Sequence, residues 1–309
     1  MANLLKYVGV AFKGACMGAA DVIPGVSGGT IAFLMGIYQE LLNSIKSVNG
    51  EAFKLLFKGK IADFWKHING NFLASLFAGI LVSVFSLARL MKYLLEFHPI
   101  PLWSFFFGLI LASAIYILKG LDKWSIQNIV SLLTGVGIAA FICVASPAQT
   151  PDALWFIFLS GAIAICAMIL PGISGSFILL LLGKYAFVMT AVTELNIPVL
   201  AVFATGCAIG IVCFSHFLSW LLKKFYMLTI ALLSGFMLGS LLKVWPWKVP
   251  GAVEGFDYPA LPAQFEQVTG LDPQLGISIA FAVLGLAIVL VMLFMLSATG
   301  IEHVYADAS

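Results

Sequence analysis

Near its start the chain reads Asp21-Val22-Ile23-Pro24-Gly25-Val26-Ser27-Gly28-Gly29-Thr30, in the middle of an apolar run. A Pro-Gly pair breaks a helix, and inside a membrane the protein itself must satisfy the freed backbone groups. A second stretch, Leu170-Pro171-Gly172-Ile173-Ser174-Gly175-Ser176, repeats the pattern 147 positions later. Two such breaks, one in each half of the chain, are typical of a duplicated membrane transporter whose substrate site lies at the breaks.

The composition indicates a helical membrane protein. Of the 309 residues, 62% are hydrophobic and only 10% are charged, against roughly 25% charged residues in soluble domains. Apolar runs long enough to cross a bilayer recur along the chain. Nucleic acid is not an expected partner, because Arg89 is the only arginine and no basic stripe exists. We expect no cofactor or metal, and we interpret the cysteines as packing residues because they lack metal-site spacing: Cys16, Cys143, Cys166, Cys207 and Cys213.

The second break lies in a segment whose length predicts a re-entrant hairpin. Ala153 to Gly183 are 31 residues without a charge. A straight helix of that length would measure about 46 Å, against roughly 30 Å of hydrocarbon. The segment is too long for one span and too short for two, and Pro171-Gly172 lies near its centre. We therefore predict two half-helices that enter and leave on the same side, broken at Pro24 in the first half and at Pro171 in the second.

The repeat extends beyond the motif and predicts the domain organisation. Residues 1–146 form the first repeat, with a re-entrant hairpin at about 5–42, a lysine-rich amphipathic insert at 43–70 on the membrane surface, and three spans. Residues 147–309 form the second, with a hairpin at about 153–192 and three spans. Later matches have an offset of 127 because the second half lacks the insert. The predicted fold is an all-α polytopic membrane protein.

The two repeats are predicted to be inverted with respect to each other. A hairpin returns to its own side, whereas three spans change sides, so the second repeat starts on the opposite face. With the N-terminus inside, most lysines fall on the cytoplasmic side, as the positive-inside rule requires. We therefore expect a multi-pass protein whose N- and C-termini are both cytoplasmic.

The glycine- and hydroxyl-rich stretches after each break predict an anion site. Consecutive backbone N–H groups beside a helix N-terminus attract negative charge. A second interpretation stays open, because small residues also let hairpin tips pack closely in membranes. Two copies in symmetric places favour binding. The candidate phosphate-binding residues of the two tips are Gly25, Ser27, Gly28, Gly29, Thr30, Gly172, Ser174, Gly175 and Ser176.

Three polar residues inside apolar segments are further candidates. Arg89 lies well before the end of its span, where a charge costs roughly 2.5–3.5 kcal/mol, and arginine binds phosphate in a bidentate fork; the alternative is snorkelling to the outer surface. His216, its counterpart in the repeat, and Asp21 are candidates for coupling transport to H⁺ or Na⁺. The alternatives are a packing histidine and an N-cap aspartate.

A rival interpretation is an intramembrane serine hydrolase. Gly25-Val26-Ser27-Gly28 and Gly172-Ile173-Ser174-Gly175 both read G-x-S-G, and a nucleophilic serine needs a base within hydrogen-bond reach. His216 is the only histidine in the interior of a predicted span, so two serines would share one base. We therefore favour a transporter without catalytic residues. A transporter of another small anion is the second alternative.

The motifs resemble those of a bacterial membrane family described as polyprenyl-phosphate (undecaprenyl phosphate) translocases. The resemblance covers almost the whole chain and implies return of the lipid carrier from the outer to the inner leaflet of the cytoplasmic membrane, for reuse in envelope polysaccharide synthesis. The expected partners are the lipid and the bilayer. The second motif has Ser176 where the first has Gly29, so the two tips need not contribute equally. The residues that carry the resemblance are Gly14-x-x-Met17-Gly18-x-Ala20-Asp21-x-x-Pro24-Gly25-Val26-Ser27-Gly28-Gly29-Thr30, Gly36-x-Tyr38, Pro171-Gly172-x-Ser174-Gly175-Ser176 and Trp245-Pro246-Trp247.

Overall fold

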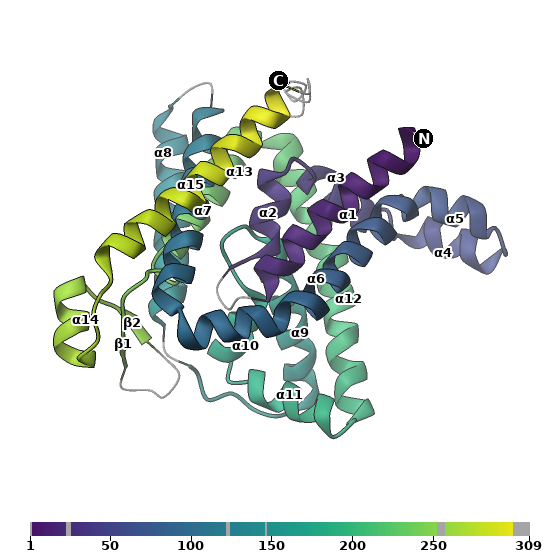
Figure 1. The fold of residues 1–309 in the computed structure, drawn as a ribbon. Coiled ribbons are helices and arrows are strands. Elements are labelled where there is room, and N and C mark those ends of the chain that lie inside the picture. Colours follow the sequence, from purple (N-terminus) through teal and green to yellow (C-terminus); the bar gives the residue numbers. More distant parts are fainter. Residues whose placement is uncertain (1, 23–25, 122–123, 146, 252–256, 299–309) are drawn as a thin grey trace. The chain divides into compact units, whose positions relative to one another are not determined.

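The structure, a computed structural model, describes residues 2–22, 26–121, 124–145, 147–251 and 257–298 (Figure 1). The described chain is mainly helical, with one short pair of strands. Five helices are long and apolar enough to cross a membrane, or six if the bent pair α10–α11 counts as one span. These findings agree with the predicted all-α polytopic fold.

The helices begin and end close to the residues that the apolar pattern predicts. The third segment of the second half, α13, has only 15 residues and is shorter than the other predicted spans. The helices are α1 (Ala2–Asp21), α2 (Gly28–Leu34), α3 (Tyr38–Lys46), α4 (Gly50–Phe57), α5 (Ile61–His67), α6 (Gly70–Phe97), α7 (Pro99–Lys119), α8 (Ile126–Val144), α9 (Leu154–Ile169), α10 (Gly175–Leu181), α11 (Tyr185–Thr193), α12 (Ile197–Lys224), α13 (Tyr226–Ser240), α14 (Pro262–Thr269) and α15 (Leu275–Ala298).

The chain folds into two compact units, each built from both halves of the sequence. Unit 1 comprises Met1–Ala88 and Pro147–Lys224, and unit 2 comprises Arg89–Ser146 and Phe225–Ser309. Unit 1 therefore holds both broken segments, whereas unit 2 holds the later helices of each half. The sequence prediction divides the chain by its repeats, at residue 146, and the compact units cut across those repeats.

Close glycine contacts hold the long helices of unit 1 together, and the same contacts recur in the two halves. A side chain at Gly14 of α1 would overlap the carbonyl of Leu76 on α6. The positions 147 and 127 residues further on behave alike, because a side chain at Gly161 of α9 would overlap the carbonyl of Phe203 on α12. Glycine at these crossings lets two backbones approach without a side chain between them.

Unit 2 pairs helices from opposite halves of the chain in the same manner. Gly108 of α7 lies against the backbone of α15, and Gly135 of α8 lies against that of α13. A two-stranded antiparallel ribbon follows α13, with β1 (Lys248–Pro250) paired to β2 (Asp257–Pro259). The strand β1 contacts α14, and nearby Trp247 packs in a cluster with Ile100 and Phe265.

Both predicted helix breaks are present in unit 1. The helix α1 ends at Asp21 and α2 begins at Gly28, while α9 ends at Ile169 and α10 begins at Gly175. Pro24 and Gly25 lie outside the described residues, so only the flanks of the first break can be described. Seven-residue helices follow both breaks, and each is ended by a glycine with positive φ, at Gly36 and at Gly183. The second of these turns bends the chain by 108° between α10 and α11.

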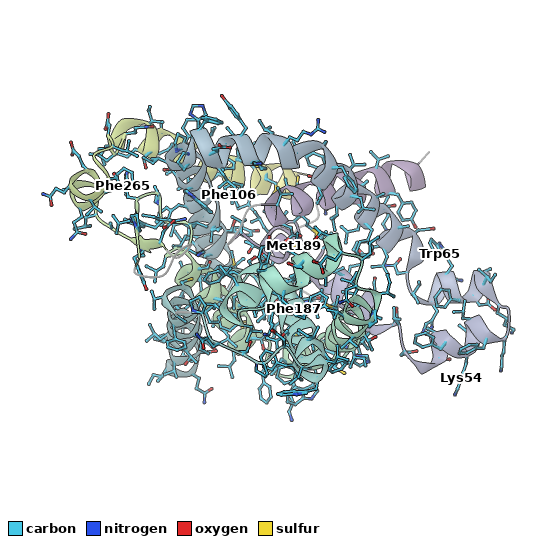
Figure 2. All side chains as sticks on the ribbon, turned by 90° about the horizontal axis from the view of Figure 1, so that it is seen from below. Lys54, Trp65, Phe106, Phe187, Met189 and Phe265 are labelled. Carbon is cyan, nitrogen blue, oxygen red and sulfur yellow. The ribbon has the colours of Figure 1, made fainter. Side chains whose placement is uncertain are left out.

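The predicted amphipathic insert forms the short helix pair α4–α5. The two helices pack on each other and project away from the other helices of unit 1 (Figures 1 and 2). Phe57 is 86% exposed and Ile61 is 67% exposed, although both side chains are apolar. Lys54 and Trp65 mark the same projecting pair in Figure 2. Exposed apolar side chains beside lysines are typical of helices that lie in a membrane interface.

Candidate functional site

The two broken segments meet in unit 1, and the first tip binds the end of the helix that precedes the second. The hydroxyl of Ser27 donates to the carbonyls of Met168 and Leu170, at 3.3 Å each. These carbonyls lie at the C-terminal end of α9, where helix geometry leaves acceptors without an intrahelical donor. The backbone N–H of Gly172 in turn donates to the Thr30 hydroxyl at 2.9 Å. The motif residues of the two halves are thus joined directly.

Tyr38 adds a third contact between the two segments, and the sequence analysis assigned it no role. Its hydroxyl donates to the carbonyl of Ile169 at 3.0 Å, and its side chain is 2% exposed. The ring also packs edge-on against Phe33, with centroids 5.0 Å apart. The recurrence of Gly36-x-Tyr38 as Gly183-x-Tyr185 was the available signal for a role, yet Tyr185 is 41% exposed.

Within the first tip, protein side chains already occupy the backbone donors. The Asp21 carboxylate accepts the N–H of Gly28 at 2.7 Å, and the Ser27 hydroxyl accepts the N–H of Gly29 at 3.1 Å. Gly29 also lies so close to the carbonyls of Met168 and Ile169 that a methyl group would not fit. In this conformation the first tip is therefore buried and closed, and Asp21 fills the place where the sequence predicts an anion.

The second tip is more open. Ser176 is exposed, and its hydroxyl lies 2.9 Å from that of Ser174. Ser174 caps α10 without a side-chain hydrogen bond to the helix, unlike Ser27 in the first tip. No residue corresponds to Asp21, because Met168 stands at the matching position, 147 residues on. The replacement of Gly29 by Ser176 therefore coincides with a real difference between the tips.

Two buried lysines hold the far ends of the short helices. Lys13 donates from α1 to the carbonyl of Met35, the residue that ends α2, at 3.0 Å. A cation is favourable at that end of a helix. Lys184, which is 2% exposed, donates to the carbonyl of Thr150 and pairs with the Asp152 carboxylate. The sequence analysis missed both roles because the partners lie 22 and more than 30 residues away.

The remaining candidates lie apart from these contacts. Arg89 is exposed on α6, where the helix passes from unit 1 to unit 2. The His216 ring is bonded through Nδ1 to the carbonyl of Val212, one turn earlier on α12, at 2.9 Å. The hydroxyl partners of Ser27 and Ser174 are carbonyls and another serine, so neither serine has the histidine partner that a hydrolase would need among the described residues.

Two cysteines lie at the crossing of α9 and α12, as expected for packing residues. The Cys207 thiol contacts the carbonyl of Gly161 at 3.3 Å, and the Cys166 thiol contacts that of Gly210 at 3.6 Å. Both are free thiols, and both sit where glycine brings the two helices together.

Comparison with known proteins identifies one family and two relatives. A family model described as VCA0040-like, "Undecaprenyl phosphate translocase-like", matches residues 17–254. A polyprenyl-phosphate transporter of Vibrio cholerae is 45% identical over 295 residues, which cover 93% of this chain and 96% of the relative. One of Staphylococcus aureus with the same name is 34% identical over 259 residues, covering 78% and 87% of the two chains. No solved structure matches the chain.

Proposed function

The chain belongs to the undecaprenyl phosphate translocase-like family, and on that basis we propose that it transports polyprenyl phosphate across the bacterial cytoplasmic membrane. Two relatives that align over most of the chain are named polyprenyl-phosphate transporters. The observation that carries the proposal is the junction of the two tips, where Gly172 and Thr30 join motifs from opposite halves. The direction is from the outer to the inner leaflet, which returns the carrier for envelope polysaccharide synthesis.

The phosphate headgroup binds at the two tips, with Arg89 as an additional contact. A phosphate in hydrocarbon is prohibitively costly unless hydrogen bonds and charge compensate it. The exposed hydroxyl of Ser176 beside Ser174 makes the second tip the first contact. The first tip becomes available when Asp21 releases Gly28. The proposed set is Gly25, Ser27, Gly28, Gly29, Thr30, Arg89, Gly172, Ser174, Gly175 and Ser176.

The two halves are inverted repeats, and their re-entrant hairpins carry the substrate between leaflets. The recurrence of the Gly14–Leu76 contact as Gly161–Phe203 supports an equivalent role for the two halves. Asp21 and His216 are the candidates for coupling to H⁺ or Na⁺. The release of Gly28 by a protonated Asp21 would link the ion to the opening of the first tip, because protonation weakens a carboxylate as an acceptor.

The proposal is tested with proteoliposomes that contain only this protein and polyprenyl phosphate in one leaflet. Wild-type protein should move the lipid between leaflets faster than protein-free vesicles, and Ser174→Ala and Ser176→Ala should slow it. Unchanged movement with wild-type protein would reject the function. Movement of inorganic phosphate without movement of the lipid would instead support the alternative of a small-anion transporter.

The hydrolase alternative has its own test. A fluorophosphonate probe should label neither Ser27 nor Ser174, because the partners of both hydroxyls are other than histidine. Labelling of either serine that disappears in His216→Ala would identify an enzyme. Intact polyprenyl phosphate should also be recovered after transport.

A further inference from the structure

A pair of lysines in unit 2 lies beside an aromatic ring, outside the site at the tips. Lys243 follows α13 in a tight turn, where its backbone N–H donates to the carbonyl of Ser240 at 2.9 Å. Lys248 lies on β1, and its ammonium is 3.4 Å from the centre of the Trp103 ring on α7. Both lysines belong to unit 2, so their proximity does not depend on how the units are placed.

The charges around Lys248 favour an anion. Burial lowers its pKa to about 7, and the positive charge of Lys243 lowers it further, while Asp257 and the Cys143 thiol oppose these effects. Burial likewise lowers the pKa of Lys243. The only carboxylate among these neighbours, Asp257, is exposed on β2, diagonal to Lys248 across the ribbon. Two like charges in a partly desolvated place are unfavourable by themselves, and a bound anion would relieve both costs.

The surroundings favour a phosphate at the membrane surface. An ammonium group binds phosphate as a compact point charge with three donors. Trp245 and Trp247 lie nearby in the chain and pack edge-on at 5.7 Å, as tryptophans do in membrane interfaces. Their indole N–H groups are used by the carbonyls of Ala260 and Pro273. The aromatic groups therefore support the ribbon, and the lysines remain to bind the ligand.

We propose that Lys243 and Lys248, with Trp103 beneath Lys248, form a second phosphate-binding site that receives a phosphate monoester in unit 2. The inference rests on the proposed function in taking the lipid headgroup as the occupant. By the predicted topology these lysines face the outer side, where the carrier would be collected. Free phosphate offers the same chemistry, and the experiment separates the two sources.

The test measures how fast each lysine is acylated by a short pulse of an amine-reactive ester at pH 7.5, read by mass spectrometry. The protein is held in lipid nanodiscs with a short-chain prenyl phosphate, with the matching prenol, or with inorganic phosphate. At a prenyl phosphate concentration about ten times its Kd, the acylation of Lys243 and Lys248 should fall about tenfold. Lys224 is the matched control, because its ammonium also lies over an indole ring, that of Trp220, at 5.5 Å.

The outcomes are distinct. Protection by prenyl phosphate alone identifies the lipid headgroup, and equal protection by inorganic phosphate identifies a general phosphate site. No protection by either, or equal protection of Lys224, overturns the proposal. The wild-type protein carries this test, so it does not depend on whether a variant folds.

Variants separate this inference from the proposed function. Lys248→Met should weaken the binding of prenyl phosphate several-fold, Lys248→Arg should restore most of it, and Lys224→Met should bind like wild type. Wild-type transport together with unchanged binding in Lys248→Met would overturn the second site and leave the proposed function standing. Protection of the lysines in a protein that transports no lipid would have the opposite meaning.

Discussion

Tyr38→Phe tests whether the contact between the two broken segments holds unit 1 together. The substitution removes only the hydroxyl that donates to the carbonyl of Ile169. The ring stays, so its packing on Phe33 is kept. The chain supplies a matched control in Tyr185, which stands 147 positions further on, is 41% exposed and makes no printed contact to the first hairpin.

The expected cost follows from burial. A typical neutral hydrogen bond contributes about 0.5–1.5 kcal/mol net, and a buried acceptor left without a donor costs about 1–3 kcal/mol. Tyr38 is 2% exposed and Ile169 is also buried, so water cannot replace the hydroxyl. We therefore expect Tyr38→Phe to lower the free energy of unfolding by about 1–3 kcal/mol. Tyr185→Phe should change it by less than about 0.5 kcal/mol, as for exposed positions.

The assay is equilibrium unfolding in mixed detergent micelles, followed by tryptophan fluorescence, with lipid transport measured on the same preparations. Tyr38→Phe should also slow transport, because the two tips lose one of their shared bonds. Equal stability of the two variants, or wild-type stability of Tyr38→Phe, would refute the role assigned to this contact.

Four further predictions concern charged groups. Asp21→Asn should fold normally, because an amide oxygen can still accept the N–H of Gly28, but transport should lose its response to an imposed H⁺ or Na⁺ gradient; an unchanged response would leave Asp21 as a cap only. Asp152→Ala should destabilise more than Lys184→Met in the unfolding assay, because it leaves a buried lysine without its carboxylate; the reverse order would contradict this reasoning. Since the pKa of Lys248 is lowered to about 7 in the folded protein, the unfolded chain binds more protons above that pH; the stability of wild type relative to Lys248→Met should therefore rise between about pH 7 and 10, and a flat difference would show that burial does not depress this group. Arg89→Lys should weaken transport, and Arg89→Ala should nearly abolish it with lipid binding reduced by about 1.5–3 kcal/mol; transport at the wild-type rate would make Arg89 a snorkelling anchor.

The sequence alone was enough for features that depend on neighbours along the chain. The helix breaks follow from Pro and Gly within apolar runs, and the ends of α9 and α10 lie where Pro171-Gly172 predicted them. Membrane crossing follows from the length of uncharged stretches. The repeat at offsets of 147 and 127 is visible in identities alone, and so is the insert that separates them. These signals are local or statistical, so no knowledge of distant contacts is needed to recognise them.

Only the tertiary structure decided which groups meet. Nothing in the motif indicates that the Ser27 hydroxyl binds the carbonyls of Met168 and Leu170, since 141 and 143 residues separate the partners. The sequence predicted equal anion sites at both tips, and the structure fills the first with Asp21 and opens the second at Ser176. The two units also cut across the two repeats. The physical reason is that helix ends leave polar backbone groups unsatisfied, and which side chain satisfies them depends on how helices far apart in the sequence pack.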